Sequence, residues 1–186
     1  MTHSAIQNKT RTPDIEIEHV REELTLGDLQ DLCDATDSAI ENGGGFGWVD
    51  LPARDMLERY WQGVIVMPNR QLFVSRLDGV ICGTCQLIRQ PHNNEAQAHI
   101  MQLTTHFVSP WARGHGLARM LLQRAEKQAK NDGATVLNLD VRDTQGAAIK
   151  LYESAQYDQY ATHPAYAYVG GSFVQGRYYM KLLDEG

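Results

Sequence analysis

The chain contains little cysteine and comparatively few basic residues. Three cysteines in 186 residues are an odd and small number, which fits a reducing compartment better than a disulfide framework. Lys and Arg number 17 against 23 Asp and Glu, for a net charge of -6. Surfaces for nucleic acid or anionic membranes depend on an excess of basic side chains. The composition therefore predicts neither a nucleic-acid nor a membrane partner.

Long apolar runs are absent as well. The longest, Val64-Ile65-Val66-Met67, is far below the roughly 20 residues that a membrane-spanning helix needs. Residues 1–13 are polar and have no apolar segment of the kind found in signal peptides, so we expect a flexible tail. Residues 14–186 are long enough for one domain around a single core. These features predict a soluble, cytoplasmic protein.

The pair Cys82-Gly83-Thr84-Cys85 resembles a redox or zinc motif. It lies in a run from Val80 to Ile88 that is typical of a strand, where residues three apart point to opposite faces. No second Cys/His pair with suitable spacing completes a set of four zinc ligands. We therefore expect structural cysteines and no metal site.

Hydrophobic periodicity predicts a mixed α/β fold in the order β-α-α-β-β-β-α-β-α-β-β. The expected elements are a strand at 15–20, helices at 26–40 and from Pro52, strands at 71–77, 80–89 and 96–108, a helix from Leu117 towards Gly133, a strand at 135–141, a helix at 145–154, and strands at 157–162 and 173–182. Thr25 is a candidate cap for the first helix. In the second helix a buried stripe is expected from Met56, Leu57, Tyr60, Trp61 and Val64. Exposed edge strands near the C-terminus make a homodimer plausible.

One junction has the character of an anion site. An apolar strand ends at Val108, and Pro110-Trp111-Ala112-Arg113-Gly114-His115-Gly116 leads into the helix at Leu117. Two glycines one residue apart allow a tight turn, and the first N–H groups of a helix can point at phosphate oxygens. The turn therefore predicts binding of a phosphorylated ligand.

A second segment, Gln145-x-x-Ala148-Ile149-x-Leu151-Tyr152-Glu153, follows in the chain. Together with Arg113-x-x-Gly116-x-Ala118 it resembles the hallmarks of the GNAT superfamily of acyl-CoA-dependent acyltransferases, in the same order. The resemblance implies a GNAT-like fold, with a mostly antiparallel twisted sheet of about seven strands and about four helices. It also implies direct transfer of acetyl from acetyl-CoA to a primary amine of a small molecule or peptide.

The resemblance assigns roles to particular residues. Tyr152 matches the general acid that protonates the departing thiolate, a transfer that the ordinary pKa values of phenols and thiols permit. The strand before the turn carries a bulge in this family, and its main chain contacts the cofactor and the thioester carbonyl. The implied cofactor-binding residues are His106, Phe107, Val108, Arg113, Gly114, His115, Gly116, Leu117, Ala118, Arg119 and Gln145.

Several positions depart from the family pattern. Gln145 replaces an asparagine, Gln156-Tyr157 replaces Gly-Phe, and Gln102 stands where many relatives carry a glutamate that helps to deprotonate the amine. The general base is therefore open, with His99, His106 and Asp140 as candidates, directly or through water.

The family's acceptor pocket is formed by regions that correspond here to residues 43–48 and to an aromatic series. We expect Phe46 and Trp48 over this pocket, together with Tyr160, Tyr166, Tyr168 and Phe173. The glycine loop and the C-terminal strand also resemble the tabtoxin-resistance type of acetyltransferase.

Two other functions compete with N-acetyl transfer. Gly114-x-Gly116 followed by Asp140 is reminiscent of dinucleotide binding, but Arg119 occupies the third glycine position and the preceding strands form an antiparallel meander. A catalytically silent module that binds acyl-CoA as a sensor is the remaining alternative, because Gln102 is not a base.

Overall fold

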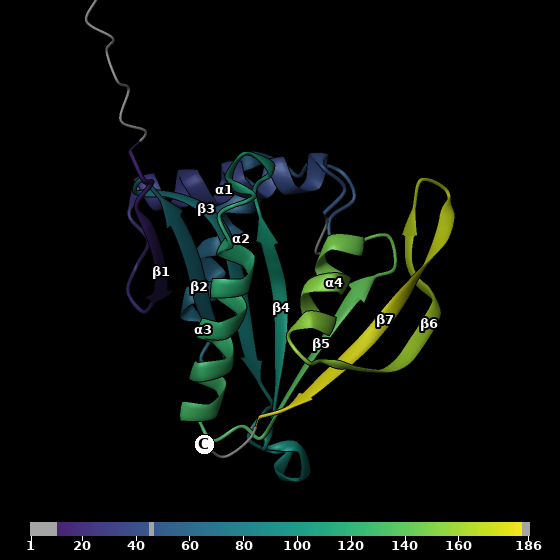
Figure 1. The fold of residues 1–186 in the computed structure, drawn as a ribbon. Coiled ribbons are helices and arrows are strands. Elements are labelled where there is room, and N and C mark those ends of the chain that lie inside the picture. Colours follow the sequence, from purple (N-terminus) through teal and green to yellow (C-terminus); the bar gives the residue numbers. More distant parts are fainter. Residues whose placement is uncertain (1–10, 45–46, 184–186) are drawn as a thin grey trace, which may run out of the picture.

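The computed structural model, described over residues 11–44 and 47–183, contains a seven-stranded sheet with helices on both faces (Figure 1). The elements are β1 (Ile15–Val20), α1 (Leu26–Glu41), α2 (Arg54–Val66), β2 (Arg70–Leu77), β3 (Val80–Arg89), β4 (Ile100–Val108), α3 (Leu117–Asn131), β5 (Val136–Arg142), α4 (Gly146–Ser154), β6 (Asp158–Val169) and β7 (Ser172–Leu182). Their order is the predicted one. Phe46 and residues 1–10 of the predicted tail lie outside the described residues.

The sheet has the strand order β1-β2-β3-β4-β5-β7-β6. Every neighbouring pair is antiparallel except β4 and β5, which run parallel and are connected through α3. Parallel neighbours need such a crossover, whereas the antiparallel pairs can be joined by short turns. The predicted mixed, mostly antiparallel sheet is confirmed.

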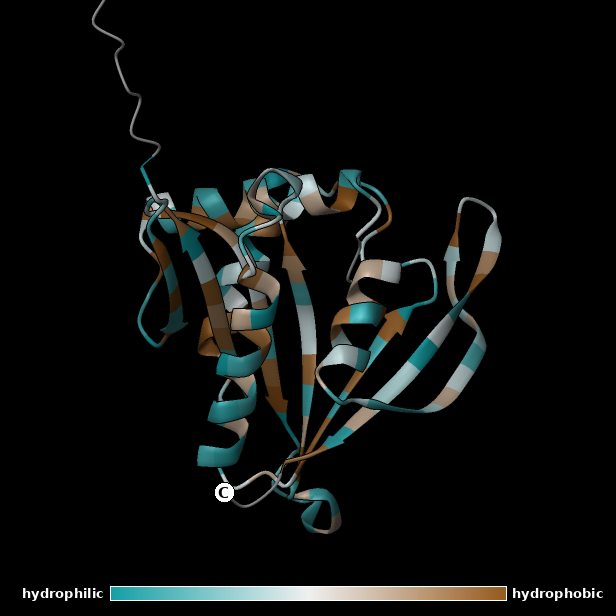
Figure 2. Cartoon of the chain, viewed as in Figure 1, coloured by the Kyte–Doolittle hydropathy of each residue, from teal (hydrophilic) through white to brown (hydrophobic). Residues whose placement is uncertain are grey.

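Two hydrophobic clusters fill the two faces of the sheet. One, the α3/α4 cluster, joins residues of α3 and α4 to one face of β2, β3, β4 and β5. The other, the α1/α2 cluster, packs α1 and α2 against the opposite face. Leu121 and Leu122 of α3 are fully buried, whereas the outward surface of this helix is hydrophilic (Figure 2). Each helix thus has the single apolar face that a two-sided α/β arrangement requires.

Some predicted boundaries were wrong. The strand expected at 96–108 begins at Ile100, because residues 95–97 form a short 3₁₀ helix after a turn-forming segment. Thr25 caps α1 as expected, accepting a hydrogen bond from the Asp28 amide. The next helix starts at Arg54 with Ala53 as its N-cap, so Pro52 precedes it. Met56 is 48% exposed and lies outside the buried stripe.

The alternation of a regular strand predicted that the side chains of Cys82 and Cys85 point to opposite faces of the sheet. They point to the same face. Both side chains belong to the α3/α4 cluster. The register of β2 and β3 shifts at this point: Ser75 pairs with Gly83 and Arg76 with Ile81, so Cys82 is an extra residue. A bulge of this kind interrupts the alternation of faces. Both thiols are free and buried, as expected for structural cysteines.

Candidate active site

The site begins at a bulge in β4. Thr84 pairs with Phe107 and Gln86 with Thr104, so β4 advances three residues while β3 advances two. Thr105 has φ of 53°, a conformation that is costly for a β-branched residue and is found where the surrounding structure enforces it. The bulge that the resemblance implied is therefore present.

The bulge decides which way the following side chains point. Before it, Met101 and Leu103 face the α3/α4 cluster; after it, Val108 faces that cluster and Phe107 faces the α1/α2 cluster. Regular alternation from Leu103 would have given Phe107 the α3/α4 side. His106, two residues from Val108, is thereby directed towards α3 and α4.

A second feature of the site is the separation of β4 from β5. Their ladder consists of Ile100↔Val136, Met101↔Leu137 and Gln102↔Asn138 and extends no further. Beyond these pairs the two strands diverge, and α4 lies beside the opening (Figure 1). The divergence creates a space between two neighbouring strands of one sheet.

The glycine turn closes one end of this space. Gly114 and Gly116 have φ of 87° and 76°, and a Cβ added at either would meet no atom within 4 Å. The positive φ values favour glycine, and the backbone there faces open space. The first turn of α3, whose N–H groups have no partner within the helix, begins directly after Gly116.

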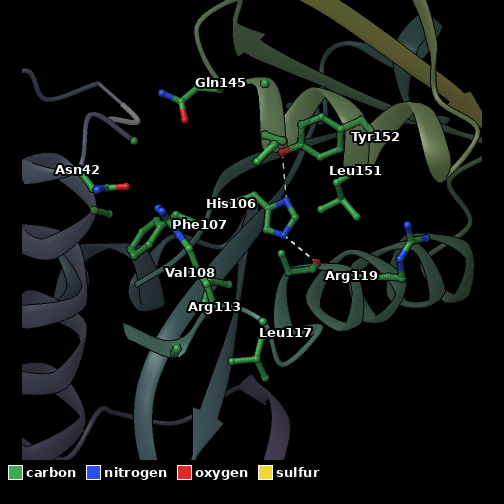
Figure 3. A pocket seen from close by; sticks show the side chains of 18 of the residues that line it. Asn42, His106, Phe107, Val108, Arg113, Leu117, Arg119, Gln145, Leu151 and Tyr152 are labelled. Carbon is green, nitrogen blue, oxygen red and sulfur yellow. Dashed lines mark hydrogen bonds between the residues drawn. The ribbon is translucent and has the colours of Figure 1, made fainter. Parts of the chain in front are cut away.

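A cavity of about 490 Å³ runs from this turn to the start of α4. Its walls come from β4, the glycine turn, α3, α4 and the end of α1 (Figure 3). Of the predicted site residues, the cavity brings together His106, Phe107, Val108, Arg113, Gly114, Gly116, Leu117, Ala118, Arg119, Gln145 and Tyr152. His115 is not among the lining residues, and Nδ1 of its ring donates to the Ala112 carbonyl at 3.1 Å.

His106 and Tyr152 are directly hydrogen bonded. His106 Nε2 lies 3.0 Å from the Ala118 carbonyl oxygen, and Nδ1 lies 3.1 Å from the Tyr152 hydroxyl (Figure 3). Because a carbonyl only accepts, Nε2 carries the proton and Nδ1 accepts from the phenol in the neutral ring. Burial lowers the pKa of His106 to about 4 and raises the pKa of Tyr152 above its usual range. Both groups are therefore neutral at physiological pH.

A more polar cavity of about 420 Å³ adjoins the first one. Gly44, His106, Gln145, Ala148 and Tyr152 line both. The additional walls are Gly47, Val49, Leu103, Thr104, Thr105, Asp140, Val141, Arg142, Tyr166, Ala167 and Tyr168. The two cavities thus meet at the His106–Tyr152 pair.

The aromatic residues predicted around an acceptor are only partly gathered here. Tyr166 and Tyr168 line the polar cavity, whereas Tyr160 and Phe173 do not and are largely exposed. Trp48 packs edge-on against Tyr60, with ring centroids 4.9 Å apart. The sequence indicated the right strands, but which of their side chains point inward depends on irregular β6–β7 pairing.

Two of the predicted residues also connect separate elements. Gln145 Nε2 donates to the Gly43 carbonyl at 2.7 Å, linking the start of α4 to the loop after α1. Arg119 donates to the Ser154 hydroxyl at 2.5 Å, linking α3 to the end of α4. Both links hold α4 across the separated strands.

The sequence did not identify Asn42, Thr144 or Leu151 as lining residues. Asn42 is the C-cap of α1 and is brought in only by the packing of α1 on the sheet. Over residues 11–44 and 47–183, no group of three or more His, Cys, Asp or Glu is placed to hold a metal ion. Within the same ranges, no helix has the length and apolarity to cross a membrane.

Comparison with known proteins identifies close similarities. The model of the acetyltransferase (GNAT) family matches residues 33–157. A protein of Azospirillum brasilense, described as an uncharacterized N-acetyltransferase in the hisH-hisA intergenic region, is 59% identical over 132 residues, covering 71% of this chain and 78% of that protein. Among solved structures, an N-acetyltransferase from Staphylococcus aureus Mu50 superposes with a TM-score of 0.78 at 20% identity, covering 92% of this chain and 99% of the other. The structure of yncA from Salmonella typhimurium with its cofactor acetyl-CoA gives 0.74 at 18% identity, covering 92% and 95%.

Proposed function

Because the chain belongs to the GNAT family of N-acetyltransferases, we propose that it transfers the acetyl group of acetyl-CoA directly to a primary amine of a small molecule or peptide. One observation supports this most strongly: the cavity from the glycine turn meets the polar cavity at His106 and Tyr152. A donor entering from one side and an acceptor entering from the other would come together at that junction.

The glycine turn fits the diphosphate of acetyl-CoA. Open space at Gly114 and Gly116 leaves room for phosphate oxygens, and a helix N-terminus favours negative charge. Arg113 also lines the cavity and adds a cation there. When bound, acetyl-CoA supplies an activated thioester.

The main chain after the bulge is suited to stabilise the negative charge that develops on the thioester oxygen. Phe107 and Val108 line the same cavity, and an amide near them is proposed to hold the thioester oxygen as negative charge develops on it. Removal of one such donor costs roughly 3–4 kcal/mol of transition-state stabilisation in measured cases.

Tyr152 is proposed as the general acid. Its hydroxyl, oriented by His106 at 3.1 Å, lies at the junction where the sulfur would be released. Burial raises the pKa of the phenol, so the phenol is protonated when the thiolate forms, but it is a weaker acid than the ordinary phenol considered from the sequence. No covalent acyl-enzyme is needed, and the buried Cys82 and Cys85 are not placed as nucleophiles.

The test is thiol release from acetyl-CoA with a panel of small-molecule amines and peptide N-termini. The wild type should acetylate at least one of them. For Tyr152→Phe we expect kcat to fall about 100- to 10,000-fold, with acetyl-CoA affinity in calorimetry unchanged. Binding of acetyl-CoA without turnover of any amine, and no effect of the substitution, would instead favour the sensor.

A further inference from the structure

A carboxylate stands at the opening between β4 and β5, on the acceptor side. Asp140 of β5 lines the polar cavity together with Tyr152. It lies two residues beyond Asn138, the last residue of β5 that pairs with β4. Building on the proposed function, we propose that Asp140 is the general base that takes the proton of the attacking amine, and that Gln102 is the residue that positions it.

Gln102 and Tyr166 hold this carboxylate from two sides. Gln102 Nε2 donates to Asp140 Oδ1 at 2.9 Å, across the point where the strands separate. The Tyr166 hydroxyl donates to Oδ2. Both donors are neutral, so neither of them cancels the carboxylate charge, and each oxygen keeps a further acceptor position. Asp140 is thus fixed in place and still able to accept a proton.

The position of Tyr166 is itself set by a close approach of the backbone. A Cβ added at Gly176 of β7 would lie 2.2 Å from Tyr166 Cγ, so the ring occupies the space that a side chain at 176 would need. The two residues that donate to Asp140 lie on separate strands, Gln102 on β4 and Tyr166 on β6, and both hydrogen bonds end at a residue of β5.

The other two candidate bases are less suited to the role. His99 precedes β4 and is exposed. It lies seven positions before His106, a distance of up to about 23 Å at the rise of a strand. His106 is close to the reaction, but both of its ring nitrogens are engaged, one by Tyr152 and the other by the Ala118 carbonyl. Asp140 lines the polar cavity, and each of its oxygens can accept one more hydrogen bond.

The geometry also explains why residue 102 is a glutamine. With a glutamate at this position, two carboxylates would lie at the 2.9 Å separation now occupied by a hydrogen bond, and like charges that close do not both ionise readily. The amide of Gln102 instead donates to Asp140. The base thus resides on β5, and β4 contributes the group that orients it.

The lone pair of the neutral amine forms the C–N bond to the thioester carbon while the π pair of the carbonyl moves onto its oxygen, and the nitrogen becomes strongly acidic. The C=O bond re-forms when the sulfur leaves. Asp140 takes one N–H proton. The C–S bond breaks, its electron pair leaves on sulfur, and Tyr152 donates its proton to that sulfur. The proton on Asp140 then returns to the Tyr152 phenolate through water, which restores the starting state.

The test compares Asp140→Asn, Asp140→Glu and Gln102→Leu with Asn138→Ala as the matched control. Asn138 lies on the same strand and face as Asp140 but lines neither cavity. Steady-state kinetics use the best amine of the wild-type panel, and thermal unfolding checks folding. We expect kcat to fall about 100-fold or more for Asp140→Asn and less for Asp140→Glu. Gln102→Leu should lower kcat while the KM for acetyl-CoA and the unfolding temperature stay unchanged, and Asn138→Ala should resemble the wild type.

The outcomes separate this inference from the proposed function. A wild type that acetylates an amine, with Asp140→Asn folded and equally fast, would overturn the assignment of the base alone. Equal losses in Asn138→Ala and Gln102→Leu, or a loss in Gln102→Leu confined to the unfolding temperature, would remove the positioning role. A wild type that acetylates no amine would overturn the proposed function and this inference with it.

Discussion

Acidification should destabilise the folded protein through His106 in particular. In the fold, burial lowers the pKa of this histidine from 6.5 to about 4. Once the chain unfolds, the ring regains its ordinary pKa and takes up a proton at any pH below about 6.5. The unfolded state therefore binds more protons than the folded state between these values. The contribution of His106 to stability is complete above pH 6.5 and is lost as the pH falls towards 4.

The size of the effect follows from the same shift. At about 1.4 kcal/mol for each pKa unit, the drop from 6.5 to about 4 corresponds to roughly 3.5 kcal/mol as an upper value. Because His106 lines an open cavity, water offsets part of the burial. We therefore expect a loss of about 1–3 kcal/mol in the free energy of unfolding between pH 7 and pH 4.

The assay is urea unfolding followed by circular dichroism at several pH values, in the absence of acetyl-CoA. The test variant is His106→Gln, because glutamine can still accept from Tyr152 and donate to the Ala118 carbonyl but does not titrate. The control is His99→Gln, an exposed histidine just before the same strand. The carboxylates and the histidines other than His99 and His106 are the same in all three proteins, so the comparison isolates His106.

The wild type and His99→Gln should lose stability in parallel, and His106→Gln should lose about 1–3 kcal/mol less over the same pH interval. Identical pH dependence of the wild type and His106→Gln would refute the reasoning. The His106 ring would then not be held neutral, and the assignment of Nδ1 as the acceptor for the Tyr152 hydroxyl would also be wrong.

Three further predictions concern the glycines and the thiols. Gly116→Ala should lower the free energy of unfolding by about 1–2 kcal/mol, because φ is 76° and a left-handed alanine is strained. The same substitution should weaken acetyl-CoA binding in calorimetry. Unchanged binding would argue against the turn as the diphosphate site. Gly176→Ala should displace the Tyr166 ring and cost about 1–3 kcal/mol in urea unfolding, with a raised KM for the amine; a variant as stable as the wild type would contradict the close contact. Cys82 and Cys85, whose pKa values are raised by burial, should resist alkylation by iodoacetamide until the protein unfolds. An acetyl group found on either cysteine by mass spectrometry, after rapid mixing with acetyl-CoA, would contradict direct transfer.

Much of the fold could be predicted because its signals are local. Thr25 caps the first helix by a contact only three residues along the chain, and the glycines of the turn adopt positive φ wherever the surrounding strands lie. Periodic apolar residues then settle which elements form and in which order. Ten of the eleven cofactor-binding residues that the resemblance to the GNAT superfamily implied line one cavity.

The active arrangement itself was decided by tertiary structure. The bulge at Thr105, which turns His106 towards Tyr152, arises at a threonine and has no glycine to mark it, because pairing with β3 enforces it. The contact between Gln102 and Asp140 spans 38 residues and exists only because β4 and β5 lie side by side before they separate. The sequence by itself determined the elements, the glycine turn and the family, since these depend on neighbours along the chain. The direction of each side chain at the reaction centre depends on strand register, which only the assembled sheet establishes.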